Sequence, residues 1–272
     1  MTLLVDVGNS AIKWALLQSN GDPLHPGQQV HRGVDDVSSQ LIEQWRSVPP
    51  QTPVIGCNVA SASAVTAVEA AAQTLRFGHV SWLKTQARFE GLFTLVNGYR
   101  DPTQLGSDRW HAMLGACSLA LEPAESVVVV NAGTATTVDC IEIDDTKSQQ
   151  GSVVFRFIGG VIAPGIRLML EALARETAGL PAAQGAPADF PDNTDAAIVT
   201  GVLDSQAGLV HRVWHRFAVG LSDRPRLVIT GGNAARLLSR LSIEGAAIED
   251  NLVLRGAGLR ARTVISTRSV AQ

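Results

Sequence analysis

DVGNSAIKWAL at residues 6–16 and NAGTATTVDCI at residues 131–141 are the two stretches that decide the fold of this 272-residue chain. In each stretch, a short apolar strand ends in a turn of glycine and small polar residues, and a second strand follows. The two stretches align without a gap at Gly8 and Gly133. One such hairpin is common, but a layout repeated half a chain apart indicates two duplicated α/β domains that face a shared cleft.

The segments around these hairpins alternate between strand and helix patterns, which is typical of layered α/β folds. The pattern predicts further strands at 53–59, 79–83 and 226–232, and a strand followed by a turn rich in glycine and proline at 153–165. It predicts helices at 63–75, 107–121, 166–177 and 194–220, and one that begins at 233. Residues 181–193 are expected to form a loop. Because the pattern breaks at 121–126, we predict an N-terminal domain over 1–121 and a C-terminal domain over 122–272.

The composition excludes several classes of protein. Hydrophobic residues make up 46% of the chain and charged residues 17%, as in compact globular proteins. The 22 basic and 25 acidic side chains form no basic stripe, which argues against nucleic-acid binding. Cys57, Cys117 and Cys140 lie far apart and show no zinc-ligand spacing, so reduced thiols in a cytoplasmic protein are expected. We predict neither a signal peptide nor a membrane helix.

The glycine turns favour phosphate binding, because consecutive backbone N–H groups can point at an anion where no Cβ blocks its approach. The hydroxyls of Ser10, Thr134 and Thr136 can donate further hydrogen bonds to phosphate oxygens. Asp6 can hold Mg²⁺ directly or through water, and Lys13 can neutralise phosphate charge. Phosphoryl transfer depends mainly on positioning and charge neutralisation, so two such turns suit it. An ordinary pair of hairpins without a ligand is the alternative.

The presence or absence of other nucleotide-binding motifs narrows the kind of nucleotide site to expect. The chain has neither GxxxxGK[ST] nor a GxGxxG turn that opens a helix. TGGN at 230–233 does end a strand and open a helix, where a nucleotide can rest on backbone N–H groups.

GSDRW at 106–110 is a second candidate site. Asp108 can accept the proton of an attacking hydroxyl, and Arg109 can pair with a substrate carboxylate or with the transferring phosphate. The alternative is an acid at a helix start that forms a surface salt bridge. His111 and His215 have no partners at metal-ligand spacing, which favours core or surface roles for both.

Together these motifs resemble, in order along the chain, those of type III pantothenate kinases. DVGNS at 6–10 resembles the family's first phosphate motif, GSDRW its GxDR motif, and NAGTATTVD at 131–139 its DxGTAxTxD motif. Further matches are GGVIAPGIRLMLEALARETAGLP at 159–181, NTDAAIVTG at 193–201, TGGNA at 230–234 and GAGL at 256–259. No one motif is decisive, but the ordered set is specific.

The resemblance implies two duplicated ribonuclease-H-like domains of the acetate and sugar kinase/Hsp70/actin superfamily, with a cleft between the domains. It implies ATP-dependent phosphorylation of pantothenate to 4'-phosphopantothenate, the first step of coenzyme A biosynthesis. The expected cofactors are Mg²⁺ and a monovalent cation, K⁺ or NH₄⁺. Family members are similar in forming homodimers that bind substrate near the dimer interface.

The resemblance also assigns roles to single residues. ATP would be held by Thr134 and by the run Asp6, Val7, Gly8, Asn9, Ser10, Ala11, Ile12 and Lys13. Asp108 would be the catalytic base on the pantothenate hydroxyl. Pantothenate would be bound by Tyr99, Gly106, Ser107, Asp108, Arg109 and Thr194. It is left open whether Thr194 acts in its own subunit or across the dimer.

Asn131 departs from the family pattern, which has an aspartate at the head of the second phosphate motif, where it binds the monovalent cation. Asparagine keeps an oxygen ligand and loses the charge, so we expect weaker cation binding. One alternative function is a non-catalytic accessory factor for gene expression; the presence of both Asp6 and Asp108 argues against it. Another is a superfamily kinase for a sugar, an N-acetylhexosamine or acetate, but those chains are usually longer.

Overall fold

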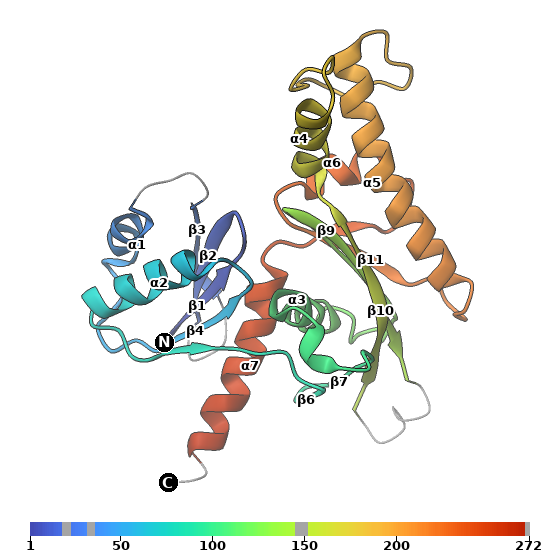
Figure 1. Ribbon diagram of the computed structural model, residues 1–272. Helices are drawn as coiled ribbons and strands as arrows, with labels where there is room; N and C mark the ends of the chain where they lie inside the picture. Colours follow the sequence, from blue (N-terminus) through green and yellow to red (C-terminus); the bar gives the residue numbers. More distant parts are fainter. Residues whose placement is uncertain (18–22, 32–35, 145–151, 270–272) are drawn as a thin grey trace. The chain divides into compact units, whose positions relative to one another are not determined.

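The computed structural model describes residues 1–17, 23–31, 36–144 and 152–269, which divide into two compact units (Figure 1). The first unit comprises Met1–Ser118 together with Leu252–Gln272, and the second comprises Leu119–Asn251. In the described residues, no helix combines the length and the apolar character that crossing a membrane requires.

The first unit is built on a five-stranded sheet with the order β3-β2-β1-β4-β5. The strands are β1 Thr2–Val7, β2 Ala11–Leu17, β3 Pro23–Val30, β4 Val54–Asn58 and β5 Val80–Trp82. β1 runs antiparallel to β2 and parallel to β4. Leu3 and Val5 face α1 (Val37–Trp45) and α2 (Ala62–Thr74), while Leu4 packs with Leu254 of α7 (Leu252–Ser269). Because both faces are covered, β1 reads as a nearly continuous apolar run.

The remaining elements of the first unit lead to α3 (Ser107–Cys117). They are the hairpin of β6 (Arg88–Glu90) and β7 (Thr94–Asn97) and the 3₁₀ helix η1 (Pro102–Gln104). α3 packs closely on α7, because a Cβ on Gly256 of α7 would collide with the carbonyl oxygen of His111 on α3. The GAGL stretch, predicted to lie in a closing helix, is therefore the contact point of that helix with α3.

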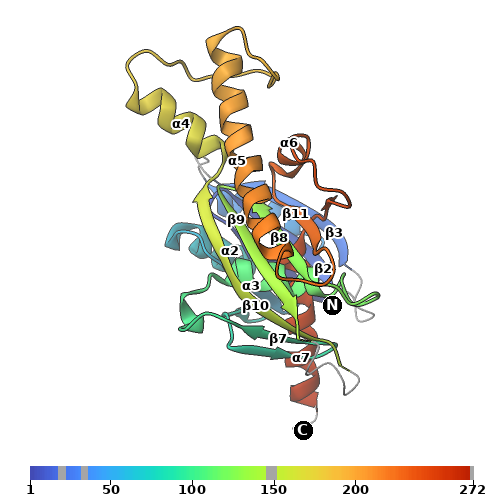
Figure 2. The same cartoon turned by 90° about the vertical axis from the view of Figure 1, so that its right-hand side faces the viewer.

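The second unit contains the strands β12-β11-β8-β9-β10 in that order. They are β8 Val127–Ala132, β9 Ala135–Ile143, β10 Val154–Pro164, β11 Arg226–Thr230 and β12 Ala247–Ile248. The long helix α5 (Thr194–Ala218) runs across β8 and β9 and buries Val210 against Val128 (Figure 2). α4 (Ile166–Glu176) packs on the first half of α5, and α6 (Ala234–Leu238) follows β11.

The two strand sets have the same plan. Both β1 and β8 pair with the next strand antiparallel, and both pair with a later strand in parallel, β4 and β11 respectively. The orders β3-β2-β1-β4-β5 and β10-β9-β8-β11-β12 therefore correspond strand by strand. The predicted duplication of α/β domains is confirmed by this topology. The domain limits at 121 and 122 stay a prediction; the compact units differ from them in that α7 belongs to the first unit.

Several element boundaries differ from those that the sequence predicted. α3 ends at Cys117 instead of residue 121, α5 ends at Ala218, and the helix after residue 233 is only the five residues of α6. β10 does not turn at its diglycine: the strand continues through it, with a shift in register between Phe157 and Gly159. β3, β6, β7 and β12 were not predicted, because they are short or carry too many polar residues to show a strand pattern.

The gapless alignment of the two hairpins is wrong beyond the turns. In the first hairpin Asp6 lies opposite Lys13, whereas in the second Asn131 lies opposite Thr137. The second turn is thus one residue shorter than the first. Lys13 therefore corresponds to Thr137 and not to Val138, the residue that the alignment by letters places there.

Candidate active site

Asp6 is the penultimate residue of β1, where the register places it opposite Lys13 of β2 and beside Cys57 of β4. Its Oδ1 atom is buried and has no hydrogen-bond partner among the described residues. Burial raises the pKa of Asp6 to about 7; the charge of Lys13 opposes that shift and the nearby Asp108 adds to it. Burial, followed by the proximity of Asp6, also raises the pKa of Cys57, so this thiol stays protonated.

The turn after β1 uses its carbonyl oxygens to hold its own shape. Gly8 N–H donates to Ala11 O at 3.1 Å, and the Nε2–H of His31 donates to Gly8 O at 2.7 Å. The backbone N–H of His31 donates to Ser10 O at 3.2 Å. His31 was not predicted, since it lies 23 residues from Gly8 and carries no local motif. The turn is thus fixed from its carbonyl side, which suits a loop that presents N–H groups to an anion.

Asp108 lies in the first turn of α3. Its Oδ1 accepts the backbone N–H of Arg109 at 2.7 Å. A Cβ at position 106 would lie 2.7 Å from this oxygen, so the carboxylate occupies the space that Gly106 leaves free. Burial raises the pKa of Asp108, and the backbone N–H and positive charge of Arg109 offset part of the rise. Asp6, Cys57 and Asp108 form one electrostatic cluster in the first unit. In addition to burial, the charge of Asp108 raises the pKa of Asp6, and the charges of both carboxylates raise the pKa of Cys57.

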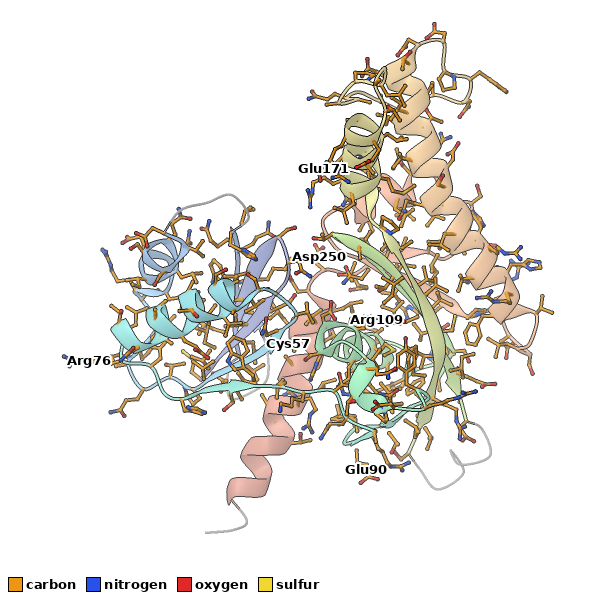
Figure 3. All side chains as sticks on the ribbon, viewed as in Figure 1. Cys57, Arg76, Glu90, Arg109, Glu171 and Asp250 are labelled. Carbon is orange, nitrogen blue, oxygen red and sulfur yellow. The ribbon has the colours of Figure 1, made fainter. Side chains whose placement is uncertain are left out.

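Arg109 is 5% exposed, so the alternative of a surface salt bridge at GSDRW is wrong. Its Nη1 donates to the Tyr99 hydroxyl at 3.1 Å, and its Cζ lies 5.7 Å from the centre of the Tyr99 ring. Asn97, which was not predicted, accepts the Tyr99 N–H at 3.0 Å. Figure 3 labels Arg109 on α3 and Cys57 on β4. The structure thus brings together Tyr99 and Arg109, two residues proposed to bind substrate.

Ser107 and His111 fix the start of α3. Ser107 Oγ donates to Leu83 O at 2.8 Å, and the Nδ1–H of His111 donates to Ser107 O at 2.7 Å. Burial lowers the pKa of His111 to about 4, which keeps the ring neutral. His111 is therefore a core residue, as the sequence favoured, and supports the turn that carries Asp108.

The second unit contains the other turn. Asn131 is the penultimate residue of β8, and Gly133 N–H donates to Ala135 O at 3.1 Å. Thr134 O accepts the N–H of Gly165 at 3.0 Å. Thr137, opposite Asn131, has a buried hydroxyl without a hydrogen-bond partner among the described residues.

The predicted TGGN turn packs directly on this hairpin. Asn233 N–H donates to Ala132 O at 3.0 Å. A Cβ at Gly231 would lie 2.7 Å from Ala132 O and 2.8 Å from Asn131 Oδ1. The structure therefore joins the second phosphate motif and the late glycine turn, 100 residues apart in the chain, into one backbone cluster.

Thr194 lies elsewhere in the second unit, as the first residue of α5. Asn193 caps this helix by accepting the N–H of Ala196 at 3.0 Å. Thr194 lines a cavity of about 570 Å³ with the end of the loop before it. Among the described residues, neither Asn131–Thr134 nor the TGGN turn contributes to the lining of this cavity.

The chemistry of the site fits the expected cations. The described part of the chain holds no group of three or more His, Cys, Asp or Glu side chains that could bind a metal by themselves. Mg²⁺ that enters with a nucleotide needs only one or two carboxylates, because phosphates and water supply the remaining ligands. The unpartnered Oδ1 of Asp6 fits that role. Asn131 offers a neutral carbonyl oxygen to a monovalent cation.

Comparisons with known proteins show the family and the fold of the chain. The type III pantothenate kinase family matches residues 2–216. Type III pantothenate kinases of Laribacter hongkongensis and Cupriavidus taiwanensis are each 37% identical to this chain; the matches cover 96% and 93% of it and 99% and 95% of the relatives. A Sinorhizobium meliloti protein, described as a 2-dehydro-3-deoxygalactonokinase, shares the fold with a TM-score of 0.54 at 16% identity, covering 97% of this chain and 99% of its own.

Proposed function

The chain belongs to the type III pantothenate kinase family, and we propose that Asp108 is the base with which it phosphorylates pantothenate. The reaction converts ATP and pantothenate to ADP and 4'-phosphopantothenate, the first step of coenzyme A biosynthesis. The fold is that of the acetate and sugar kinase/Hsp70/actin superfamily. Because the two relatives named above are described as kinases, they give no support to the alternative of a non-catalytic accessory factor.

The observation that supports this role is the place of Asp108 at the start of α3, where its carboxylate fills the space left by Gly106 and burial raises its pKa. A carboxylate with an ordinary pKa is a weak base for a hydroxyl proton, and burial raises the pKa of Asp108 toward the working pH. As the pantothenate oxygen forms a bond to the γ-phosphorus of ATP, its proton passes to Asp108. The bond between the γ-phosphorus and the bridging oxygen breaks, and ADP leaves with those electrons. Gly106 keeps space open for the carboxylate, and Ser107 and His111 fix its helix turn.

Asp6, by binding Mg²⁺, and Lys13, by its own charge, compensate the negative charge of ATP. Mg²⁺ neutralises phosphate charge when it is bound with the nucleotide. Asp6 holds this ion through its unpartnered Oδ1, directly or through water. Lys13, directly opposite Asp6, opposes the rise in the pKa of the carboxyl that burial causes, and it pairs with phosphate. The backbone of Val7–Ile12 surrounds the phosphates, and Thr134 contacts ATP from the second hairpin.

Pantothenate carries a carboxylate, and the Arg109–Tyr99 pair suits it. The guanidinium is buried and oriented by the Tyr99 hydroxyl, so it is already placed to receive a planar anion. Gly106 and Ser107 complete the binding site, and Thr194 contacts substrate as well.

The remaining assignments are the monovalent cation, the dimer and the compartment. Asn131 binds K⁺ or NH₄⁺ weakly through its neutral oxygen. The protein is a homodimer, as the resemblance to the family implies; Phe190, which precedes the cavity-lining Pro191 in the chain, is 95% exposed and available for contact with a second subunit. The three free, buried cysteines support a cytoplasmic location.

The test is formation of phosphopantothenate from Mg-ATP and pantothenate, with K⁺ or NH₄⁺ present or absent. Asp108→Asn should lower kcat about 1,000-fold with little change in ATP binding, since the amide cannot accept the proton. Asp223→Asn, an exposed site, is the matched control and should retain activity. Undiminished turnover in Asp108→Asn would assign the base elsewhere. A folded protein that makes no product in any salt would overturn the kinase function.

A further inference from the structure

The loop at residues 181–193 is fastened along α5 although it contains no helix or strand. Ala188 N–H donates to Thr200 Oγ1 at 3.0 Å, and the same hydroxyl donates to Ala188 O at 3.2 Å. Gln184 N–H donates to Asp195 Oδ1 at 3.2 Å. Thr200 and Asp204 are one helical turn apart, so both face the loop. These hydrogen bonds attach the loop to α5 as far as Ala188, the residue before Asp189.

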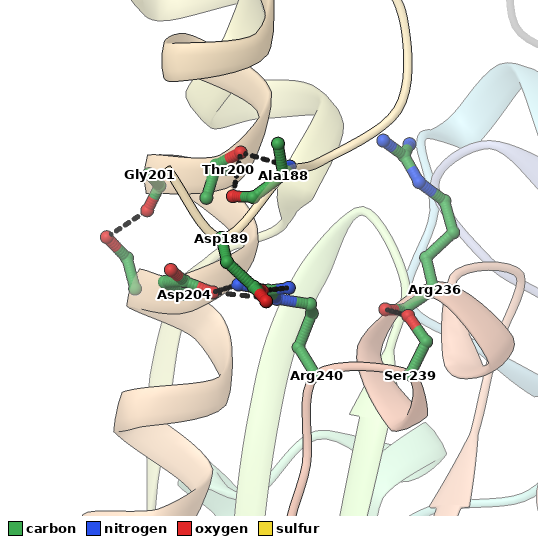
Figure 4. Close-up of polar contacts among 9 residues, drawn as sticks. Ala188, Asp189, Thr200, Gly201, Asp204, Arg236, Ser239 and Arg240 are labelled. Atoms are coloured by element: carbon green, nitrogen blue, oxygen red, sulfur yellow. Dashed lines mark hydrogen bonds and ion pairs between the residues drawn. The ribbon is translucent and has the colours of Figure 1, made fainter. Parts of the chain in front are cut away.

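Arg240 continues this attachment from a different part of the chain (Figure 4). Its Nη2 lies 2.8 Å from Asp204 Oδ1 on α5, and its Nη1 lies 3.3 Å from Asp189 Oδ1 on the loop. The Arg240 side chain is 20% exposed, whereas the Asp189 and Asp204 side chains are 85% and 52% exposed. One guanidinium thus bridges the loop and the helix that begins with Thr194.

Three backbone hydrogen bonds connect the segment that ends at Arg240 with the late glycine turn. Ala234 N–H donates to Gly231 O, Leu237 N–H to Asn233 O, and Arg240 N–H to Leu237 O, each at 3.0 Å. Leu237 is fully buried and anchors this segment in the core. Gly231–Arg240 is therefore one hydrogen-bonded segment, with the glycine turn at one end and the guanidinium at the other.

We propose that Arg240 is a positioning residue that links the nucleotide turn to the substrate threonine. It holds Asp189, five residues before Thr194, at a fixed place relative to Gly231. The inference rests on the proposed roles of Thr194 and of the TGGN turn. Ordering of the turn by ATP would then favour the loop position that binds pantothenate, and by linkage pantothenate would favour ATP to the same extent.

Stability alone does not explain the bridge. Ion pairs that reach exposed carboxylates contribute little to folding, and the loop is already attached through Thr200. What the bridge adds is the placement of the segment from Asp189 to Thr194, which no other ion pair among the described residues reaches.

Steady-state kinetics provide the first test. Arg240→Gln and Asp189→Asn should each raise the KM for pantothenate about tenfold with kcat changed less than about twofold, as expected for lost ground-state positioning. Arg240→Lys should give an intermediate KM, because a lysine ammonium can reach one carboxylate but lacks the fork. Arg175→Gln removes an exposed ion pair on α4 and should leave the KM unchanged. An unchanged KM in Arg240→Gln would overturn the proposal.

Calorimetry provides the second test. The Kd for pantothenate is measured with and without a non-hydrolysable ATP analogue in the wild type and in Asp189→Asn. We expect the analogue to tighten pantothenate binding at least about fivefold in the wild type and hardly at all in Asp189→Asn. Equal tightening in both proteins would overturn the inference. Thr194→Ala distinguishes the proposed link through Arg240 from the proposed role of Thr194 in substrate binding. If Thr194→Ala raises the KM for pantothenate while Arg240→Gln does not, only the link through Arg240 is disproved. If Thr194→Ala has no effect on an active enzyme, the proposed role of Thr194 fails first.

Discussion

The hairpins β1–β2 and β8–β9 have the same hydrogen-bonded plan, but they carry different charges at the same place. The penultimate residue of the central strand is Asp6 in the first hairpin and Asn131 in the second. The residue opposite is Lys13 in the first and Thr137 in the second. An ionisable pair in one hairpin is thus a neutral pair in the other. In the proposed function, the first hairpin binds the divalent ion and compensates phosphate charge, while the second offers backbone and neutral oxygens.

Asp6→Asn makes the first hairpin like the second and should have the largest effect in this comparison. The amide cannot supply the negative charge that Mg²⁺ requires, so we expect kcat to fall about 100- to 1,000-fold. The measurement is turnover over a series of Mg²⁺ concentrations, with circular dichroism as the check on folding. Turnover of Asp6→Asn within a factor of three of the wild type would show that the difference in charge between the two hairpins has no role in catalysis.

The pH dependence of stability should differ between these same two proteins. The folded state raises the pKa of Asp6 from 3.8 to about 7, so folded protein binds this proton more tightly than the unfolded chain. Stability without Mg²⁺ should therefore fall as pH rises from about 4 to about 7, by a loss of the order of 3 kcal/mol. Differential scanning calorimetry of wild type and Asp6→Asn tests this, because Asp6→Asn should lack that part of the slope. Parallel curves would mean that Asp6 does not ionise in this range.

Gly8 of the first hairpin turn and Gly231 of the TGGN turn, which packs on the second hairpin, should respond differently to alanine. Gly231 has φ of +100°, and its Cβ would lie 2.7 Å from the backbone oxygen of Ala132, so Gly231→Ala adds strain as well as a clash. At Gly8 the nearest atom would be Ala11 O at 3.3 Å, and no positive φ is involved. We expect a loss of about 2–3 kcal/mol in unfolding free energy for Gly231→Ala and less than about 1 for Gly8→Ala. Urea denaturation measures both, and equal losses would contradict the closer packing at Gly231 in the TGGN turn.

The sequence alone predicted both hairpins because their central strands are buried on both faces and read as apolar runs. It also placed Asp108 and Arg109 in one cluster, since neighbours in a helix turn stay together. It missed His31, whose contact with Gly8 spans 23 residues, and Asn97, which contacts the nearby Tyr99 but belongs to no recognised motif. The unequal lengths of the two turns were hidden as well, because matching letters at Gly8 and Gly133 does not fix which residues pair across the strands.

Association of Arg240 with Asp189 was equally invisible, because 51 residues separate them and neither belongs to a phosphate motif. Local patterns thus predicted a chemistry for each turn, while the contacts that hold each turn in place came from tertiary structure. The pairing of α3 with α7 shows the same limit: GAGL predicted a helix but not its partner.

Asn131→Asp is the reciprocal exchange and should have the smallest effect. It restores a charge at the second turn, where the neighbouring Thr137 hydroxyl is buried and has no partner among the described residues. A carboxylate binds K⁺ more strongly than an amide oxygen does, so we expect the K⁺ concentration for half-maximal activation to fall about fivefold, equivalent to about 1 kcal/mol. Activity titrations with K⁺ in wild type and Asn131→Asp measure it, with Na⁺ held as the ionic-strength control. If the wild type already saturates at low millimolar K⁺ and Asn131→Asp does not shift the curve, Asn131 is not the residue that weakens the site. The charge would then be supplied by a group outside the hairpin, and the two turns would differ in side chain without differing in cation chemistry.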